Sequence, residues 1–137
     1  KPATVYFQTY ENNTKMISEI TSKNPDIFLE RELEIRKKNK LPPFQRFISL
    51  ILTGDNEIKL EKEAINFKNF IENKIEGKIL GPVNAPLFRL KRKFRIRFLI
   101  RGLKSMKLQS SLAKIIPKYK FSSGIKLSVD VDPINFN

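Results

Sequence analysis

The sequence contains no cysteine, no histidine and no tryptophan among its 137 residues. Without cysteine the chain can form no disulfide and offers no thiol nucleophile. Without cysteine or histidine it also lacks the usual ligands of zinc and of iron–sulfur clusters. Mechanisms that use imidazole as a general base are excluded as well. These absences remove many classes of enzyme from consideration.

Long hydrophobic runs are also missing. The longest apolar stretches, such as residues 98–100, are far shorter than the roughly 20 residues that cross a bilayer, and no signal peptide opens the chain. We therefore expect a cytoplasmic protein with no membrane contact. Because Lys1 is followed directly by a strand-like segment, we also expect the chain to be a piece of a longer polypeptide.

Positive charge is abundant and unevenly distributed. The net charge is +13, although hydrophobic content is an ordinary 40%, as expected of a folded basic protein. Residues 1–76 hold 13 basic and 12 acidic side chains, whereas residues 77–129 hold 14 basic side chains and no acidic one. Such a field attracts polyanions, of which nucleic acid is the commonest. The alternative is that the charge serves only solubility.

The first third of the chain predicts a strand and a helical arm. Residues 4–10 are rich in β-branched and aromatic side chains and predict a strand. Asn13 or Thr14 could cap a short helix to residue 21, and Asn24 with Pro25 could start a second helix over residues 26–38. We expect three parts: a terminal strand of a preceding domain over 1–12, a helical linker over 13–41 and a C-terminal domain over 42–137.

The remaining chain predicts an α+β domain. Leu41-Pro42-Pro43 ends the arm because proline disfavours helix in the residue before it. The patterns that follow predict strands over 44–53, 78–80, 87–101 and 125–131, with a turn at Gly81-Pro82. They also predict a helix over 57–75, whose apolar residues share one face at spacings of four and three, and a helix over 105–116 that Ser105 caps. This βαββαβ order indicates the ferredoxin-like split βαβ fold, a four-stranded antiparallel sheet with both helices on one face.

Residues 94–101 carry the clearest binding signal. Apolar and basic side chains alternate there, so arginines are expected on the sheet face opposite the helices. Two-residue spacing on a strand is roughly 6.5–7 Å, close to the phosphate step of an extended nucleic acid. The predicted DNA-binding residues are Arg89, Lys91, Arg92, Lys93, Arg95, Arg97 and Arg101. The alternative is an edge strand that charge protects from aggregation.

Two further places in the sequence are candidate sites. The start of the last helix, with Lys104 and Lys107, could hold a phosphate or a peptide carboxylate, or could be an ordinary capped surface helix. Asp130 and Asp132 could bind Mg²⁺, but no third ligand is near in the sequence. Turn capping and ion pairing are the favoured interpretation of this pair.

Several motifs in order carry a family resemblance. They are Val5-Tyr6-Phe7-Gln8-Thr9-Tyr10, Phe28 with Glu32-Leu33-Glu34-Ile35-Arg36, Pro42-Pro43-Phe44, Gly81-Pro82 with Ala85-Pro86, Lys93-Phe94-Arg95, Leu108-Gln109 and Asp130-Val131-Asp132-Pro133. On these motifs the chain resembles the C-terminal region of the PriA family of bacterial replication-restart helicases, also called primosomal protein N′.

The resemblance implies a specific setting. The parent would be an ATP-dependent 3′-to-5′ DNA helicase that acts at abandoned forks, and residues 1–12 would end its second helicase lobe. Lys93 and Arg95 would contact the DNA backbone, and Gln109 would contact the acidic tail of single-stranded DNA-binding protein (SSB). Other expected partners are branched or single-stranded DNA, the parent's other domains and primosome proteins. ATP, magnesium and zinc would bind only outside this chain, which needs no cofactor.

Three functional hypotheses follow. The first is a non-catalytic DNA-binding accessory domain of a helicase. The second is a protein-docking module for helicase lobes or for the SSB tail, without direct DNA contact. The third, a small ferredoxin-like enzyme, is disfavoured because no pair of residues for acid–base catalysis is visible.

Overall fold

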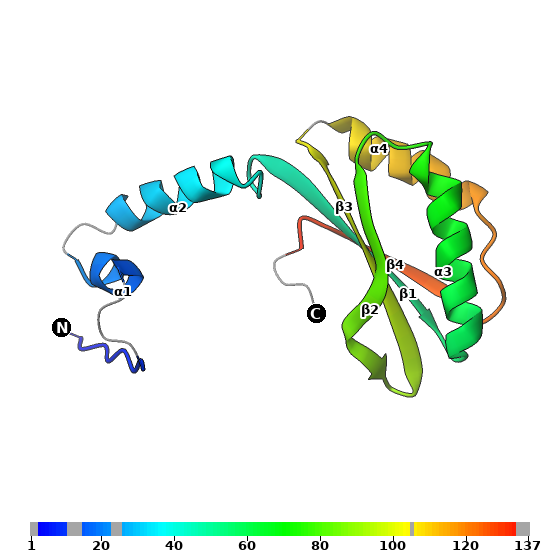
Figure 1. Ribbon diagram of the computed structural model, residues 1–137, viewed down its shortest axis with the longest axis horizontal. Helices are drawn as coiled ribbons and strands as arrows, with labels where there is room; N and C mark the ends of the chain where they lie inside the picture. Colours follow the sequence, from blue (N-terminus) through cyan, green and yellow to red (C-terminus); the bar gives the residue numbers. More distant parts are fainter. Residues whose placement is uncertain (1–2, 11–14, 23–25, 105, 134–137) are drawn as a thin grey trace. The chain divides into compact units, whose positions relative to one another are not determined.

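The computed structural model describes residues 3–10, 15–22, 26–104 and 106–133 (Figure 1). The chain divides into two compact units, Lys1–Asn39 and Lys40–Asn137. The first unit contains helix α1 (Lys15–Ile20) and helix α2 (Asp26–Lys38), neither of which buries a residue. The bounds of α2 are those predicted from its acidic start and basic end.

The strand predicted over residues 4–10 is not formed. Residues 3–10 have no regular secondary structure. A strand needs a neighbour for its N–H and C=O groups, and none of the described strands pairs with this segment. The predicted caps at Asn13, Thr14 and Asn24 lie outside the described residues.

The second unit forms one sheet covered by helices. Its elements are β1 (Gln45–Gly54), α3 (Glu57–Glu72), β2 (Lys78–Leu90), β3 (Lys93–Leu103), α4 (Met106–Ile115), the 3₁₀ helix η1 (Ile116–Lys118) and β4 (Lys126–Val131). All neighbouring strands are antiparallel, in the order β2-β3-β1-β4. Both long helices lie on one side of the sheet (Figure 1). The α+β class is confirmed, and the strand order is compatible with a ferredoxin-like arrangement.

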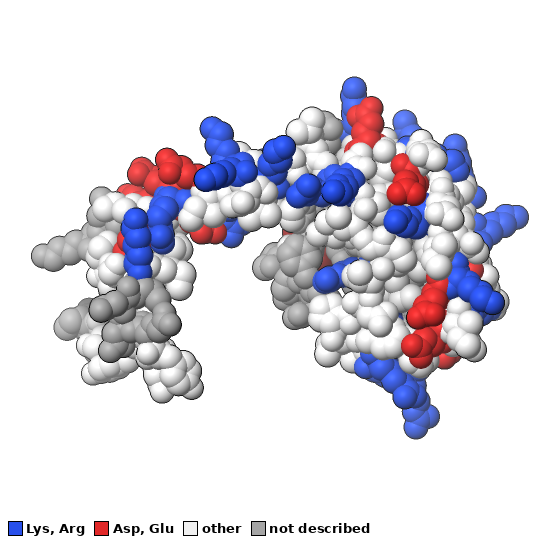
Figure 2. Space-filling model, in the orientation of Figure 1, with Lys and Arg blue, Asp and Glu red and all other residues white. Residues whose placement is uncertain are grey.

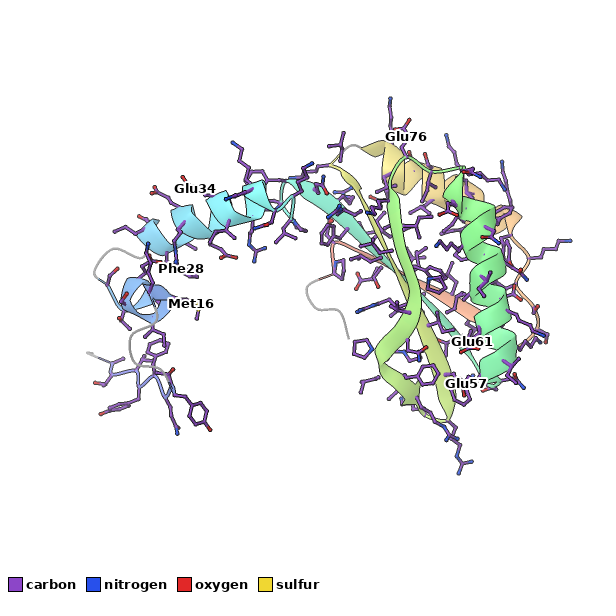
Figure 3. All side chains as sticks on the ribbon, viewed as in Figure 1. Met16, Phe28, Glu34, Glu57, Glu61 and Glu76 are labelled. Carbon is purple, nitrogen blue, oxygen red and sulfur yellow. The ribbon has the colours of Figure 1, made fainter. Side chains whose placement is uncertain are left out.

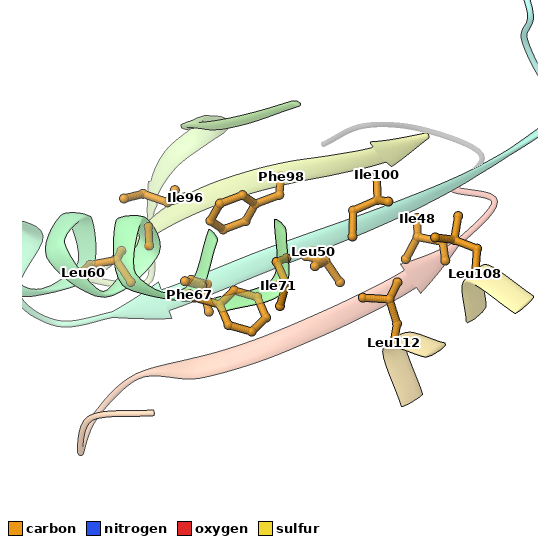
Figure 4. Packing of buried hydrophobic residues seen from close by; sticks show 12 residues of the cluster. Ile48, Leu50, Leu60, Phe67, Ile71, Ile96, Phe98, Ile100, Leu108 and Leu112 are labelled. Carbon is orange, nitrogen blue, oxygen red and sulfur yellow. The ribbon is translucent and has the colours of Figure 1, made fainter. Parts of the chain in front are cut away.

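Helix α3 provides the largest part of the helix layer of the core. The side chain of Asn56 caps it by accepting a hydrogen bond of 2.9 Å from the N–H of Lys59. Four apolar residues on one face of α3 are fully buried, as the sequence periodicity predicts: Leu60, Ala64, Phe67 and Ile71. They pack against the central strands β1 and β3 (Figure 4). Within the described ranges, no helix has the length and apolar character that crossing a membrane requires.

The segment predicted as one strand over residues 87–101 is instead a hairpin. Strand β2 continues through Gly81-Pro82, where a turn was predicted, and ends at Leu90. Gly81 has φ +100°, and β2 shifts register against β3 on both sides of residues 83–84, so glycine absorbs a bulge rather than ending the strand. The hairpin turn itself is Lys91-Arg92, which lacks the Asn or Gly that marks such turns.

Candidate nucleic-acid interface

Strand β3 separates apolar and basic side chains onto opposite faces of the sheet. Ile96, Phe98 and Ile100 are at most 3% exposed and lie in the core. Arg95, Arg97 and their neighbours at alternate positions therefore belong to the other face, which we call the open face because α3 and α4 lie on the opposite side (Figure 1). The predicted alternation over residues 94–101 is confirmed.

Strand pairing adds basic residues to the open face that the sequence interpretation missed. Arg101 lies directly opposite Lys78 of edge strand β2. At the other end of β3, Arg95 is paired with Thr53, which is in turn paired with Lys126 of β4. Directly paired residues share a face of a sheet. Only the register brings these cations together, and a single sequence does not show which residues pair.

A pocket lies where Lys78 and Arg101 meet. Its volume is about 340 Å³, and Lys40 contributes a third cation to its lining. Glu76 is the acidic residue of this pocket, so the lining keeps an excess of positive charge. Such a group of cations suits an anion of phosphate size.

The structure divides the seven predicted DNA-binding residues into two groups. Arg95, Arg97 and Arg101 belong to the open face. The other four lie at the β2–β3 turn: Arg89, Lys91, Arg92 and Lys93. Arg89 lies opposite Phe94, with its Cζ 5.5 Å from the centre of the Phe94 ring, so it is on the face of the helices. Lys93, two positions before Arg95 on β3, also faces the open side of the sheet. DNA binding by the seven residues stays a prediction.

Three carboxylates of the described residues lie near the basic side chains of this region. Lys93 Nζ is 3.8 Å from Asp55 Oδ1, a distance at which an exposed pair contributes little. Asp130 is exposed on β4, opposite Ser49. Asp132 pairs with Arg46, whose Nε is 3.2 Å from Oδ2, and accepts a hydrogen bond from the N–H of Phe47. Ion pairing, the favoured interpretation of this acidic pair, is confirmed for Asp132.

The start of α4 lies beside an apolar groove. Lys104, Lys107 and Gln109 are exposed, and Gln109 Oε1 accepts a 3.1 Å hydrogen bond from Arg46 Nη1. Ser105, the predicted cap, is outside the described residues. A groove of about 270 Å³ continues from Gln109 between α4 and β4. Its apolar lining consists of Ile48, Leu112, Ala113, Ile116, Pro117, Val129 and Val131. Gln109, which was predicted to contact the SSB tail, lines this groove.

The residues described do not form a binding site for zinc or another metal ion. The chain has neither cysteine nor histidine. The described residues bring together no group of three acidic side chains that could hold an ion. The cations of the open face can attract and position an anionic polymer.

Comparison with known proteins places this geometry in a family. The model for the "Primosomal protein N C-terminal domain" matches residues 37–134. Replication restart protein PriA is 36% identical over 132 residues in Rickettsia conorii and 37% identical over 132 residues in Rickettsia typhi, covering 96% of this chain and 20% of each relative. In Chlamydia muridarum the protein of that name is 27% identical over 135 residues, which is 97% of this chain and 18% of the relative. The chain thus spans about a fifth of the length of the curated relatives it matches. It belongs to the primosomal protein N C-terminal domain family, the C-terminal domain of the replication restart protein PriA.

Proposed function

We propose that this domain binds the backbone of single-stranded or branched DNA through its open face. It would serve as the non-catalytic C-terminal domain of a cytoplasmic, ATP-dependent helicase that restarts replication forks. The cysteines that bind zinc and the sites for ATP and magnesium would then belong to other parts of that helicase. Primosome proteins and the helicase's own domains would be further partners.

One observation carries the proposal. Strands β2 and β3 hold six basic side chains and no acidic one, and the register concentrates Lys78 and Arg101 at one end of the open face. Cations in a row along a strand match the regular charges of a nucleic-acid backbone. The nearby pocket with Lys40 would accept one phosphate of that backbone.

The test is the salt dependence of binding to a 20-nucleotide single strand, measured by fluorescence anisotropy. If about five phosphates are neutralised, the logarithm of the association constant should fall against the logarithm of salt concentration with a slope of roughly −3.5. The double variant Lys78→Glu and Arg101→Glu should weaken binding and flatten this slope. A flat response in the unmodified chain, or an unchanged slope in the variant, would contradict the proposal.

A matched control keeps the change in net charge constant. Lys118→Glu and Lys120→Glu reverse the same number of charges at exposed positions after α4, within and just beyond η1. This pair should lower affinity only through the weaker overall field. Equal losses in the two double variants would mean that net charge, rather than the open face, holds the DNA.

The groove beside Gln109 favours a second candidate function, docking of the SSB tail. An acidic peptide with an apolar end could place that end between α4 and β4 and its carboxylates near Lys104 and Lys107. The check is titration of a labelled SSB-tail peptide. Charge reversal at Lys104 or Lys107 should weaken its binding, whereas reversal at Arg97 should not. Loss of binding in the Arg97 variant alone would remove the groove from consideration.

A further inference from the structure

Four cations are gathered at the end of the β2–β3 hairpin. They are Arg89, Lys91, Arg92 and Lys93, and we call them the hairpin tip. Lys91 and Arg92 form the two-residue turn and are exposed to solvent. Blue side chains protrude from this end of the molecule in Figure 2. Arg89 lies on the face of the helices, whereas Lys93 alternates with Arg95 and extends the open face to the turn.

The hairpin tip is built in a conformation that its residues do not favour. Lys91 has φ +51° and Arg92 has φ +65°, so both adopt the left-handed region that Asn and Gly usually occupy in such turns. Two long cations at these positions cost backbone strain that Asn-Gly would avoid. Solubility does not require this choice, because charge could be placed anywhere on the surface.

Aromatic packing supports the two strands next to the hairpin tip. The rings of Phe88 and Phe94, one on each strand, have centroids 5.4 Å apart. The guanidinium of Arg89 lies over the Phe94 ring at 5.5 Å. Such contacts orient a cation without neutralising its charge. These contacts fix the strand ends next to the turn, and the charges of the turn remain available to an anionic partner.

Distance separates the hairpin tip from the far end of the open face, where Lys78 and Arg101 lie. Arg101 follows Lys93 by eight residue steps along strand β3, which is about 26 Å at roughly 3.3 Å per residue. Acidic side chains restrict the approach from the helix side. Glu57 and Glu61 lie near the start of α3, at the same end of the domain as the hairpin tip (Figure 3). An anionic polymer would meet the tip from its end or from the open face.

We propose that the hairpin tip is a second contact, specific for duplex DNA, while the open face holds single-stranded DNA. This inference rests on the proposed function and assigns its two substrate forms to different residues. Two paired strands lie about 4.8 Å apart, and with their side chains they fit a major groove about 12 Å wide. Lys91 and Arg92 at the turn, with Arg89 and Lys93 beside them on the two strands, would meet the phosphates that border the groove.

The decisive variant is Lys91→Asn with Arg92→Gly in the full 137-residue chain. It removes both charges of the turn and supplies the residues that this turn geometry prefers, so folding is not compromised. Binding is measured by anisotropy over a salt series, with a blunt 20-base-pair duplex and with a 20-nucleotide single strand. For the duplex, the salt slope should fall in magnitude by about 2, one for each lost phosphate contact. For the single strand, the slope should be unchanged.

The Lys78→Glu and Arg101→Glu variant provides the reciprocal measurement. It should weaken single-strand binding more strongly than duplex binding. If the Asn-Gly variant binds duplex with an unchanged slope, or loses equal slope on both substrates, the assignment of the hairpin tip to duplex DNA is wrong. Those results would leave single-strand binding by the open face intact, whereas absence of single-strand binding in the unmodified chain would refute the proposed function itself.

Discussion

At the scale of single residues, Gly81 is the position where a side chain is least tolerable. Its φ of +100° disfavours any L residue, and a Cβ there would lie 2.7 Å from the carbonyl oxygen of Arg97. We expect Gly81→Ala to lower the free energy of unfolding by at least the roughly 1–3 kcal/mol typical of such strain. Urea denaturation monitored by circular dichroism measures this loss.

Gly124 offers the matched control. It also has positive φ, +84°, but a Cβ there meets no atom within 4 Å. Gly124→Ala should therefore show the strain alone and destabilise less than Gly81→Ala. Equal losses at the two glycines would indicate that β2 relaxes away from Arg97 without cost.

Tyr119 should make the free energy of unfolding decrease at alkaline pH. Burial, followed by the hydrogen bond and the negative charge of Glu63, raises the pKa of Tyr119 from its ordinary 10.0 to about 12. Because the folded state holds the phenol proton more tightly than the unfolded state, this contribution is complete below pH 10 and is lost as pH rises from 10 to 12. The free energy of unfolding of the unmodified chain, relative to Tyr119→Phe, should fall over that interval.

All other ionisable groups are shared by the two proteins. The difference between the unmodified chain and Tyr119→Phe therefore isolates the tyrosine, provided that unfolding is measured by urea at each pH. A difference that stays constant from pH 9 to pH 12 would show that Glu63 and burial do not act on this phenol.

At the scale of elements, Phe67 joins α3 to the sheet and to the segment after α4. Its ring centroid lies 6.1 Å from that of Phe98, 5.1 Å from Tyr119 and 5.0 Å from Phe121. Phe67→Ala should cost about 3–5 kcal/mol of unfolding free energy, because it opens a cavity among three elements. Ile65→Ala on the same helix, at a site 52% exposed, should cost far less in the same urea titration. Similar costs would contradict this packing.

The sequence predicts elements well where one pattern runs without interruption. The alternation on β3 and the four-and-three spacing on α3 report burial directly, so both faces were predicted correctly. The sequence does not predict the Lys91-Arg92 turn, because neither residue is common in two-residue hairpin turns. The strand over residues 4–10 was predicted from side-chain preference, which does not ensure a pairing partner.

The candidate site was predictable along one strand but not across strands. Arg95, Arg97 and Arg101 follow from alternation alone. Lys78 and Lys126 join them only through pairing between β2 and β3 and between β4 and β1. Pairing between segments distant in the sequence depends on the whole fold, and a local pattern does not contain it.

At the scale of the whole molecule, charge follows the layers of the second unit. Helix α3 carries four acidic and three basic side chains, whereas β2 and β3 carry six basic side chains and none acidic. The positive field is therefore strongest on the sheet. An approaching polyanion would be oriented toward the open face and the hairpin tip before it makes contact, and this orientation should weaken as salt screens the field.

The core also shows where cooperative stability lies. Every residue of the buried cluster falls between Ile48 and Leu112, whereas α1 and α2 bury none. Helices this short are marginal alone in water. We expect deletion of residues 1–39 to shift the thermal unfolding midpoint by less than about 4 °C, equivalent to under about 1 kcal/mol. Circular dichroism should record the same single transition with less helical signal. A larger shift would mean that residues 1–39 stabilise the second unit. DNA titration of the truncated domain would then show whether the cations of residues 1–39 contribute to binding as well.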